Sequence, residues 1–205
     1  MPRISDEQRE VRRSQILEAA RACVLEHGLE AVSMEMIVAR SGLSTGAVYG
    51  YFRGKDDIIN AVVSEGTAQL GRELSPILTN PTPPAPPEFL ESLLRTIVEF
   101  STRERGADRL LVSIHGWSHS QSNPTLKAST RSDYRRLRTA FTHVARRWQD
   151  TGVLRPSADT AGVAELLMSL TLGFVAQRAL IGTASIRAHV CALAALCDSP
   201  GRTTS

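Results

Sequence analysis

The sequence predicts an all-α protein. Apolar residues recur at spacings of three and four in every hydrophobic segment, and no stretch of useful length alternates as a strand does. Capping and stop residues divide the 205-residue chain into some nine helices. We therefore expect three short helices at the N-terminus, followed by a larger helical bundle.

The first three helices are indicated by their ends. Ile16, Ala20 and Val24 step along one face of a helix that Gly28 ends. Ser33 is an N-cap for a second helix over 34–40, which the pair at 41–42 closes. Ser44 or Thr45 caps a third, which runs to about residue 52. A tight glycine-containing turn thus joins two short helices.

The later helices follow from longer apolar stripes. One helix opens at Lys55 and carries its stripe from Ile59 to Leu74. Five prolines within residues 81–87 predict a stiff, extended connector. Four further helices are centred on residues 89–98, 110–117, 134–148 and 185–197. The segment 160–181 is apolar nearly all round, so we expect it to be buried on more than one side.

Composition and charge limit the class of protein. Residues 1–60 have a net charge of −1 and residues 61–205 one of +4, so bulk charge marks neither half as a nucleic-acid surface. The chain starts without the apolar core of a signal peptide, and Gln177 and Arg178 interrupt the longest apolar stretch. These features predict a cytoplasmic protein.

The three cysteines predict no special chemistry. Cys23, Cys191 and Cys197 lie in apolar surroundings at no metal-ligand spacing. We expect reduced, buried thiols that act as small hydrophobes. The sequence accordingly predicts neither a metal site nor a cofactor.

The turn between the second and third helices has the features of a helix-turn-helix. Gly42 supplies the backbone freedom for the bend, and Leu43 fills the angle between the two helices. Small residues then open the third helix and leave its amides exposed. A recognition helix enters the major groove of DNA with this end against the base edges.

Residues 13–59 resemble the DNA-binding region of TetR-family regulators. The stretch SGLSTGAVYGYFRGKDDI matches the family signature nearly position for position, and the turn followed by Tyr-x-x-Phe-x-x-Lys is its specific part. Gly50 departs from the pattern, which usually has a larger side chain there. The resemblance implies a helix-turn-helix domain over residues 1–56 and a helical ligand-binding and dimerisation domain over residues 57–200. It also implies a regulator, most simply a repressor, and not an enzyme.

The resemblance carries DNA contacts over to particular residues. Thr45, Gly46 and Ala47 match the positions that read bases. Tyr49, Tyr51 and Lys55 match phosphate contacts, although an aromatic residue such as Tyr49 can also be pure core. Ser33 and Ser44, as helix caps, complete the predicted DNA-binding set. Phe52 is expected to be core.

The second half is expected to bind a small-molecule effector and to dimerise. Candidate pocket residues, each of which could equally be core, are Phe100, His115, Trp117, Tyr134, Phe141 and Phe174, with Gln177 and Arg178 as polar handles. Aromatic rings beside His and Arg suit an apolar or aromatic molecule with a polar or acidic group. The last two helices resemble the family's four-helix dimer interface, and a two-fold dimer needs a palindromic operator.

Other classes of protein have weaker support. Residues 116–120, GWSHS, approach the Gly-x-Ser-x-Gly elbow of hydrolases, but the last residue is serine and no strand precedes them. His115 and His119 could face one metal, yet the acidic residue of the zinc motif is absent. An architectural DNA-binding protein without a ligand remains open. A second nucleic-acid surface is suggested by one arginine cluster, which is otherwise a solvated helix face: Arg131, Arg135, Arg136, Arg138, Arg146 and Arg147.

Overall fold

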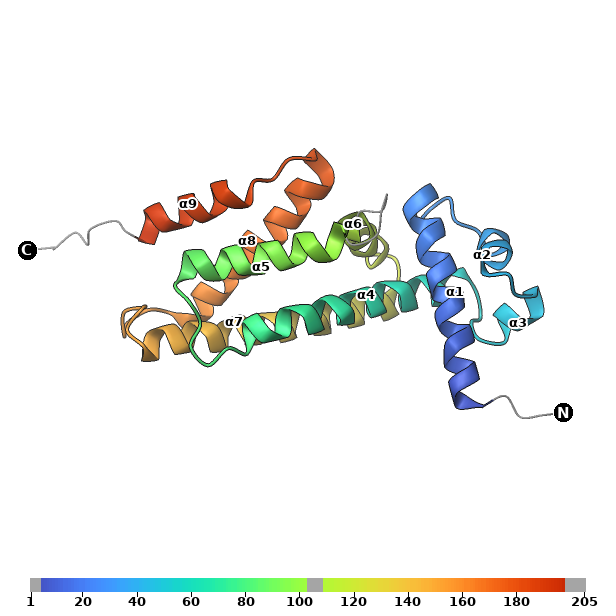
Figure 1. Ribbon diagram of the computed structural model, residues 1–205, viewed down its shortest axis with the longest axis horizontal. Helices are drawn as coiled ribbons and strands as arrows, with labels where there is room; N and C mark the ends of the chain where they lie inside the picture. Colours follow the sequence, from blue (N-terminus) through green and yellow to red (C-terminus); the bar gives the residue numbers. More distant parts are fainter. Residues whose placement is uncertain (1–4, 103–108, 198–205) are drawn as a thin grey trace, which may run out of the picture. The chain divides into compact units, whose positions relative to one another are not determined.

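The computed structural model describes residues 5–102 and 109–197, and this part of the chain is all-α. Its helices are α1 (Asp6–His27), α2 (Met34–Ser41), α3 (Thr45–Tyr49), α4 (Lys55–Leu78), α5 (Pro86–Thr102), α6 (Arg109–His119), α7 (Pro124–Asp150), α8 (Thr160–Ile181) and α9 (Ile186–Cys197) (Figure 1). The predicted fold class and the nine helices are confirmed for these residues.

The chain divides into two compact units. The first contains residues 1–69 and 104–130, and the second contains residues 70–103 and 131–205. The first unit therefore combines α1, α2 and α3 with the start of α4, α6 and the start of α7. The functional boundary that the sequence places after residue 56 stays a prediction.

The first unit is built on the buried face of α1. A capping box starts this helix: Gln8 N–H donates to Ser5 Oγ at 3.2 Å, and Ser5 N–H donates to Gln8 Oε1 at 3.4 Å. Ile16, Leu17 and Ala20 are completely buried. They belong to one apolar cluster with residues from all four N-terminal helices, which also includes Ile37, Val48, Phe52, Ile58 and Ile59.

The conformation of Gly42 and two hydrogen bonds fix the turn between α2 and α3. Gly42 has φ +68°, in the left-handed region that favours glycine. The Gln15 amide of α1 donates to the carbonyl oxygen of Ser41 at 2.7 Å, and Leu43 N–H donates to the Ser41 hydroxyl at 3.3 Å. The turn is thereby attached to α1 and to the end of α2.

The second unit has an aromatic core between α5 and α7. Phe89 meets Phe141 and Trp148 edge to face, with ring centroids 6.3 and 5.2 Å apart. Helix α9 lies along α5, as Figure 1 shows, and α8 also contacts α5. On α7, Phe141, Val144 and Trp148 are all buried, so the strict spacing of its apolar residues correctly predicted the buried face of this helix.

The proline-rich connector is shorter than the sequence predicts. Helix α5 begins at Pro86, so two of the five prolines lie in its first turn, where the missing N–H costs nothing. Trp148 Nε1 donates to the carbonyl oxygen of Pro84 at 2.8 Å and so fixes the connector to α7. The predicted end of the third helix was also imprecise, because α3 ends at Tyr49 and not near residue 52. Helix α4 continues past its apolar stripe, through Pro76 to Leu78.

Two of the three cysteines contradict the prediction of buried thiols. Cys23 is buried in the core of the first unit, whereas Cys191 and Cys197 are exposed on α9. None of the residues of α9 is buried in this single chain. The expectation relied on apolar sequence neighbours, which on this helix are themselves exposed.

Helix α8 also has an exposed apolar face. It is long and apolar enough to cross a membrane by length and composition, and 28% of its apolar window is buried. Leu166, Leu180 and Ile181 are 54%, 68% and 69% exposed. Burial on more than one side, which the sequence predicts for this helix, is therefore not achieved within one chain.

The conformation of Gly42 gives a first prediction. Gly42→Ala forces an L-residue into the left-handed region and should lower the free energy of unfolding by about 1–2 kcal/mol. Gly66→Ala is the matched control, because Gly66 lies inside α4 with open space where an alanine Cβ would lie. This control should raise stability by roughly 0.5–1 kcal/mol. Urea unfolding measures both, and equal shifts of the two variants would contradict the role of the turn.

Candidate DNA-recognition site

The N-terminus of α3 is open to solvent. Ser44 caps the helix, with its hydroxyl accepting from Ala47 N–H at 3.3 Å. Thr45 and Gly46 are exposed and Ala47 is half-buried, while Val48 anchors the opposite face with no exposed surface. Nothing lies within 4 Å of a Cβ placed on Gly46. A five-residue helix thus presents small side chains outward from a fixed base.

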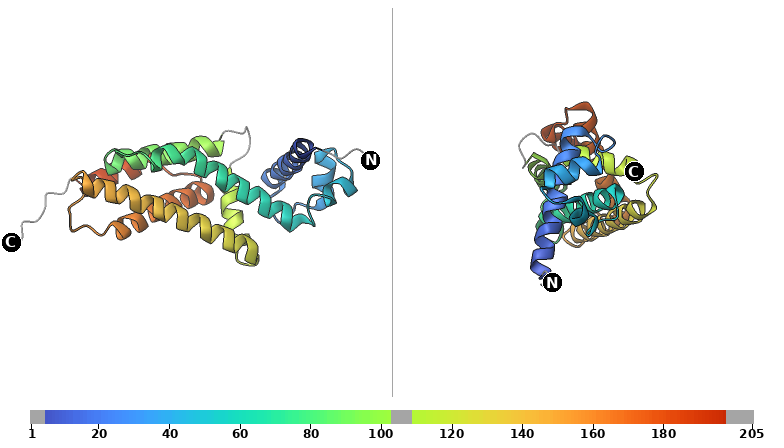
Figure 2. Two further views of the ribbon diagram at one scale, coloured as in Figure 1. Left: turned by 90° about the horizontal axis from the view of Figure 1, so that it is seen from below. Right: turned by 90° about the vertical axis from the view of Figure 1, so that its right-hand side faces the viewer.

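The rest of the first unit leaves this end accessible. Helices α3 and α6 lie at opposite ends of the unit with α1 between them (Figures 1 and 2). The Ser44 carbonyl accepts the first helical hydrogen bond, from Val48 N–H at 3.1 Å, so the preceding amides point outward without helical partners. Such an end suits the edge of a base or a phosphate oxygen.

The two tyrosines differ in their surroundings. Tyr49 is 51% exposed, so the interpretation of this residue as pure core is wrong. Tyr51 is half-buried against the core cluster, and the Arg9 guanidinium lies 5.9 Å from the centre of its ring. Phe52 is buried, as predicted, with Arg13 at 5.8 Å from its ring centre.

Arg9 is a candidate that the sequence interpretation missed. It lies on α1, next to the predicted phosphate contact Tyr51. The signal was present in the sequence, because Arg9 and Arg13 are four residues apart and share a helix face. Net charge concealed it, since the acidic residues of the same helix outweigh the arginines when the residues are counted together.

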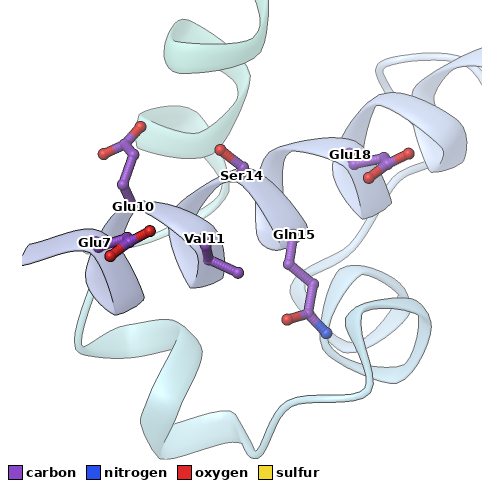
Figure 3. Close-up of a pocket in the computed structure, with 6 residues that line it drawn as sticks. All are labelled: Glu7, Glu10, Val11, Ser14, Gln15 and Glu18. Atoms are coloured by element: carbon purple, nitrogen blue, oxygen red, sulfur yellow. The ribbon is translucent and has the colours of Figure 1, made fainter. Parts of the chain in front are cut away.

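Those acidic residues gather on another face of α1. Glu7, Glu10 and Glu18 line an open hollow together with Val11, which is 63% exposed (Figure 3). Carboxylates repel phosphate, so this face cannot contact a DNA backbone. Arg13, beside Phe52, pairs with Glu10 at 3.6 Å, so Arg9 beside Tyr51 is the better placed of the two arginines for a phosphate.

Lys55 is the first residue of α4. Its Nζ donates to the carbonyl oxygen of Glu30 at 3.1 Å, which connects the loop after α1 to the start of α4. Two of the three ammonium donors remain for another acceptor. The side chain is half-buried, so its charge is held in place near the N-terminus of a long helix.

Ser33 caps α2 and also interacts with the side chain of Glu35 in the first turn of that helix. Its hydroxyl accepts from Met36 N–H at 3.3 Å, as an N-cap does. Hydrogen bonds from the Ser33 side chain and from the backbone of Glu35 lower the pKa of the Glu35 carboxyl. The Ser33 hydroxyl is therefore already engaged by the Met36 amide and by the Glu35 carboxylate.

The predicted effector residues are divided between the two units. His115 and Trp117 are half-buried on α6 in the first unit. Those of the second unit are Phe100, Phe141 and Phe174, which are buried, Tyr134 and Arg178, which are half-buried, and Gln177, which is exposed. Phe141 belongs to the aromatic core described above. The roles of all eight residues in ligand binding stay predictions.

Two alternative interpretations lose support. Residues 116–119 of the hydrolase-like pentapeptide lie inside helix α6, whereas a nucleophile elbow needs a strand-to-helix turn. In the arginine cluster of α7, Arg136 pairs with Asp133 and Arg138 with Glu165, and Arg147 donates to backbone carbonyls at 3.1 and 2.9 Å. Half of the cluster is thus engaged within the protein, which favours a solvated helix face.

Comparison with known families decides the class. The family model for the N-terminal region of bacterial regulatory proteins of the TetR family matches residues 16–62. The model for the C-terminal region of BetI-type transcriptional repressors matches residues 88–198. The chain belongs to the TetR family. It is a ligand-responsive, DNA-binding transcriptional regulator and not an enzyme, and regulators of this family bind operator DNA and small-molecule effectors and act as dimers.

Individual relatives agree with this assignment. The HTH-type transcriptional regulator UidR of Escherichia coli (strain K12) is 27% identical over 166 residues, 80% of each chain. The HTH-type transcriptional regulator BetI of Pectobacterium atrosepticum is 28% identical over 129 residues, 62% of this chain and 64% of the relative.

Solved structures share the fold. Salmonella enterica GusR superposes with a TM-score of 0.70 at 20% identity and covers 96% of this chain and 97% of its own. A regulator from Saccharomonospora viridis in complex with choline superposes with a TM-score of 0.74 at 24% identity, covering 94% of this TetR-family chain and 97% of its own.

Lys55 provides a test of the phosphate contacts. Lys55→Ala should weaken binding to operator and non-operator DNA about equally and should reduce the slope of log K against log salt by about 1. Lys127→Ala removes the other lysine of the chain, on α7, and should leave the slope unchanged. Salt titration by fluorescence anisotropy measures both variants. An unchanged slope for Lys55→Ala excludes Lys55 from the contacts.

Proposed function

We propose that this TetR-family regulator is a cytoplasmic repressor that holds a palindromic operator through α3 and releases it when a small molecule binds. The observation that carries the proposal is the solvent-exposed N-terminus of α3, with small residues on a buried base. A short helix of this kind can approach base edges closely in a major groove.

Specific roles follow for the residues of this end. Thr45 donates a hydrogen bond to a base edge, while Gly46 and Ala47 allow close approach or contact a thymine methyl group. Phosphate contacts come from the surrounding side chains, namely Ser33, Ser44, Tyr49, Tyr51, Lys55 and Arg9. The base readers thus lie at the N-terminal end of α3, and the phosphate contacts come from Tyr49 at its other end and from the neighbouring helices and caps.

A second copy of the chain is the proposed partner of α8 and α9. Both helices expose apolar side chains, and Leu196 on α9 is 76% exposed. On α8, Gly173 has open space where a Cβ would lie, as expected where another helix approaches closely. Pairing these two helices with their copies buries this surface and places two recognition helices about 34–36 Å apart.

The effector acts by preferring one of two conformations. Ligand binding lowers DNA affinity only if the ligand binds the DNA-free conformation more tightly. The candidate effector-binding residues are the eight described above, of which Phe100, Phe141 and Phe174 are buried in the core. The choline in the Saccharomonospora complex makes a quaternary ammonium one candidate effector class, and an acidic molecule is the other.

Selection of bound fragments from the native genome tests the function. The wild-type protein should enrich palindromes whose half-sites lie one helical turn apart, and a metabolite extract should release them. Thr45→Val keeps the shape of the side chain, removes its hydroxyl, and should change the preferred base in each half-site. Thr139→Val, at an exposed position on α7, is the control. Binding without sequence preference and without release would indicate an architectural protein instead.

The dimer has a separate test. Leu166→Asp places a charge on the exposed face of α8 and should convert the dimer to a monomer that binds a palindrome at least tenfold more weakly. Val153→Asp is the matched control, because Val153 is 46% exposed but follows α7. Size-exclusion chromatography with light scattering measures the mass. A dimeric Leu166→Asp protein argues against this interface.

A further inference from the structure

Arg178 continues the buried stripe of α8. The residues of this stripe follow one another at spacings of three and four and all are buried: Ala164, Leu167, Thr171 and Phe174. The next position in the series is Arg178, which is half-buried. A guanidinium therefore occupies a core-facing position where the pattern calls for an apolar residue.

The Nε of this guanidinium has no partner in the part of the chain that the structure describes. It is buried and donates to no acceptor there. Other partly buried arginines are satisfied: Arg21 meets Glu65 at 3.3 Å, and Arg147 donates to two carbonyl oxygens. A buried donor whose hydrogen bond is left unmade costs free energy, and a charged one costs more.

No carboxylate pairs with Arg178 among the described residues, although α5, which contacts α8 and α9, carries Glu88, Glu91 and Glu99. Helix α9 contains no acidic residue, and the only one in α8, Glu165, lies more than three turns away and pairs with Arg138. The C-terminus of α8 favours a nearby cation, since Gly182 ends the helix four residues later. That attraction acts on the charge as a whole and leaves the buried Nε–H unsatisfied.

Aromatic side chains lie next to the unsatisfied group. Phe174 is one turn before Arg178 on the same face and is completely buried. Its ring meets the His189 imidazole of α9 edge to face, with centroids 5.4 Å apart. The His189 Nδ1 is within 2.9 Å of the Ser185 carbonyl oxygen, so this ring is held in place. An apolar, aromatic wall thus adjoins a cationic end.

We propose that Arg178 binds the anionic group of the effector, and this inference rests on the proposed ligand-responsive function. A carboxylate or phosphate accepts two parallel hydrogen bonds from a guanidinium, one of them from Nε. An apolar or aromatic body of the ligand then lies against Phe174. The same charge repels a quaternary ammonium, so the effector class is a small organic acid and not a choline-like cation.

Thermal unfolding without ligand is the first test. Arg178→Met keeps much of the length of the side chain and removes a buried donor that has no acceptor, so its Tm should rise above that of the wild type. Arg135→Met removes an exposed arginine of α7, outside the proposed dimer interface, and should leave the Tm nearly unchanged. A clear fall in Tm for Arg178→Met means that the protein itself satisfies the guanidinium, which overturns the proposal.

Ligand-dependent stabilisation is the second test. The probes are the straight-chain carboxylates from acetate to decanoate, benzoate, the corresponding neutral amides, and benzyltrimethylammonium. At least one carboxylate should raise the Tm of the wild type, and Arg178→Met should bind it on the order of 30-fold more weakly or worse. Equal stabilisation of both proteins, stabilisation by the cation alone, or no stabilisation by any carboxylate overturns the proposal.

Operator binding separates this inference from the proposed function. Arg178→Met should bind the selected operator as the wild type does, but the stabilising carboxylate should no longer release it. If neither protein binds an operator, the proposed function fails by itself. If both are released by the carboxylate at the same concentration, the operator function stands and the role of Arg178 is refuted.

Discussion

The turn at Gly42 is the constraint on which the DNA-binding surface depends. Its left-handed conformation directs α3 away from α2, and the hydrogen bond from Gln15 to the Ser41 carbonyl holds the turn against α1. Val48 then fixes one face of a helix that is too short to be stable alone. Exposure of Thr45 is the direct result, because the only anchored side of α3 is the opposite one.

The sequence predicted this unit well because its information is local. Ser33 and Ser44 act as N-caps, as expected: each hydroxyl accepts a hydrogen bond from the backbone N–H three residues later. Proline-rich residues 81–87 were harder, since a proline is equally compatible with a connector and with the first turn of a helix. Only the tertiary contact of Trp148 with the carbonyl of Pro84 selects between them.

Contacts between chains lie beyond what periodicity reveals. The sequence showed that α8 is apolar nearly all round. It did not show whether the residues that pack against α8 belong to the same chain or to a second copy. In the single chain Leu180 and Leu196 remain exposed, and Cys191 shares the exposed side of α9. The exposed leucines and the wrong prediction for the cysteines have the same cause. In the single chain, the apolar faces of α8 and α9 are exposed to solvent, and the proposed pairing with a second copy would bury them.

Arg178 connects the energetics of the free protein to regulation. A ligand shifts a conformational equilibrium only by the difference between its affinities for the two states. A buried guanidinium Nε–H without an acceptor raises the free energy of the state that buries it. An acid that pairs with Arg178 removes this cost and stabilises that state selectively, whereas an apolar ligand of equal size gains only contact area. The unmade hydrogen bond at the buried Nε of Arg178 is therefore a stability loss that an acidic effector can reverse, and this reversal contributes to the differential affinity that release of the operator requires.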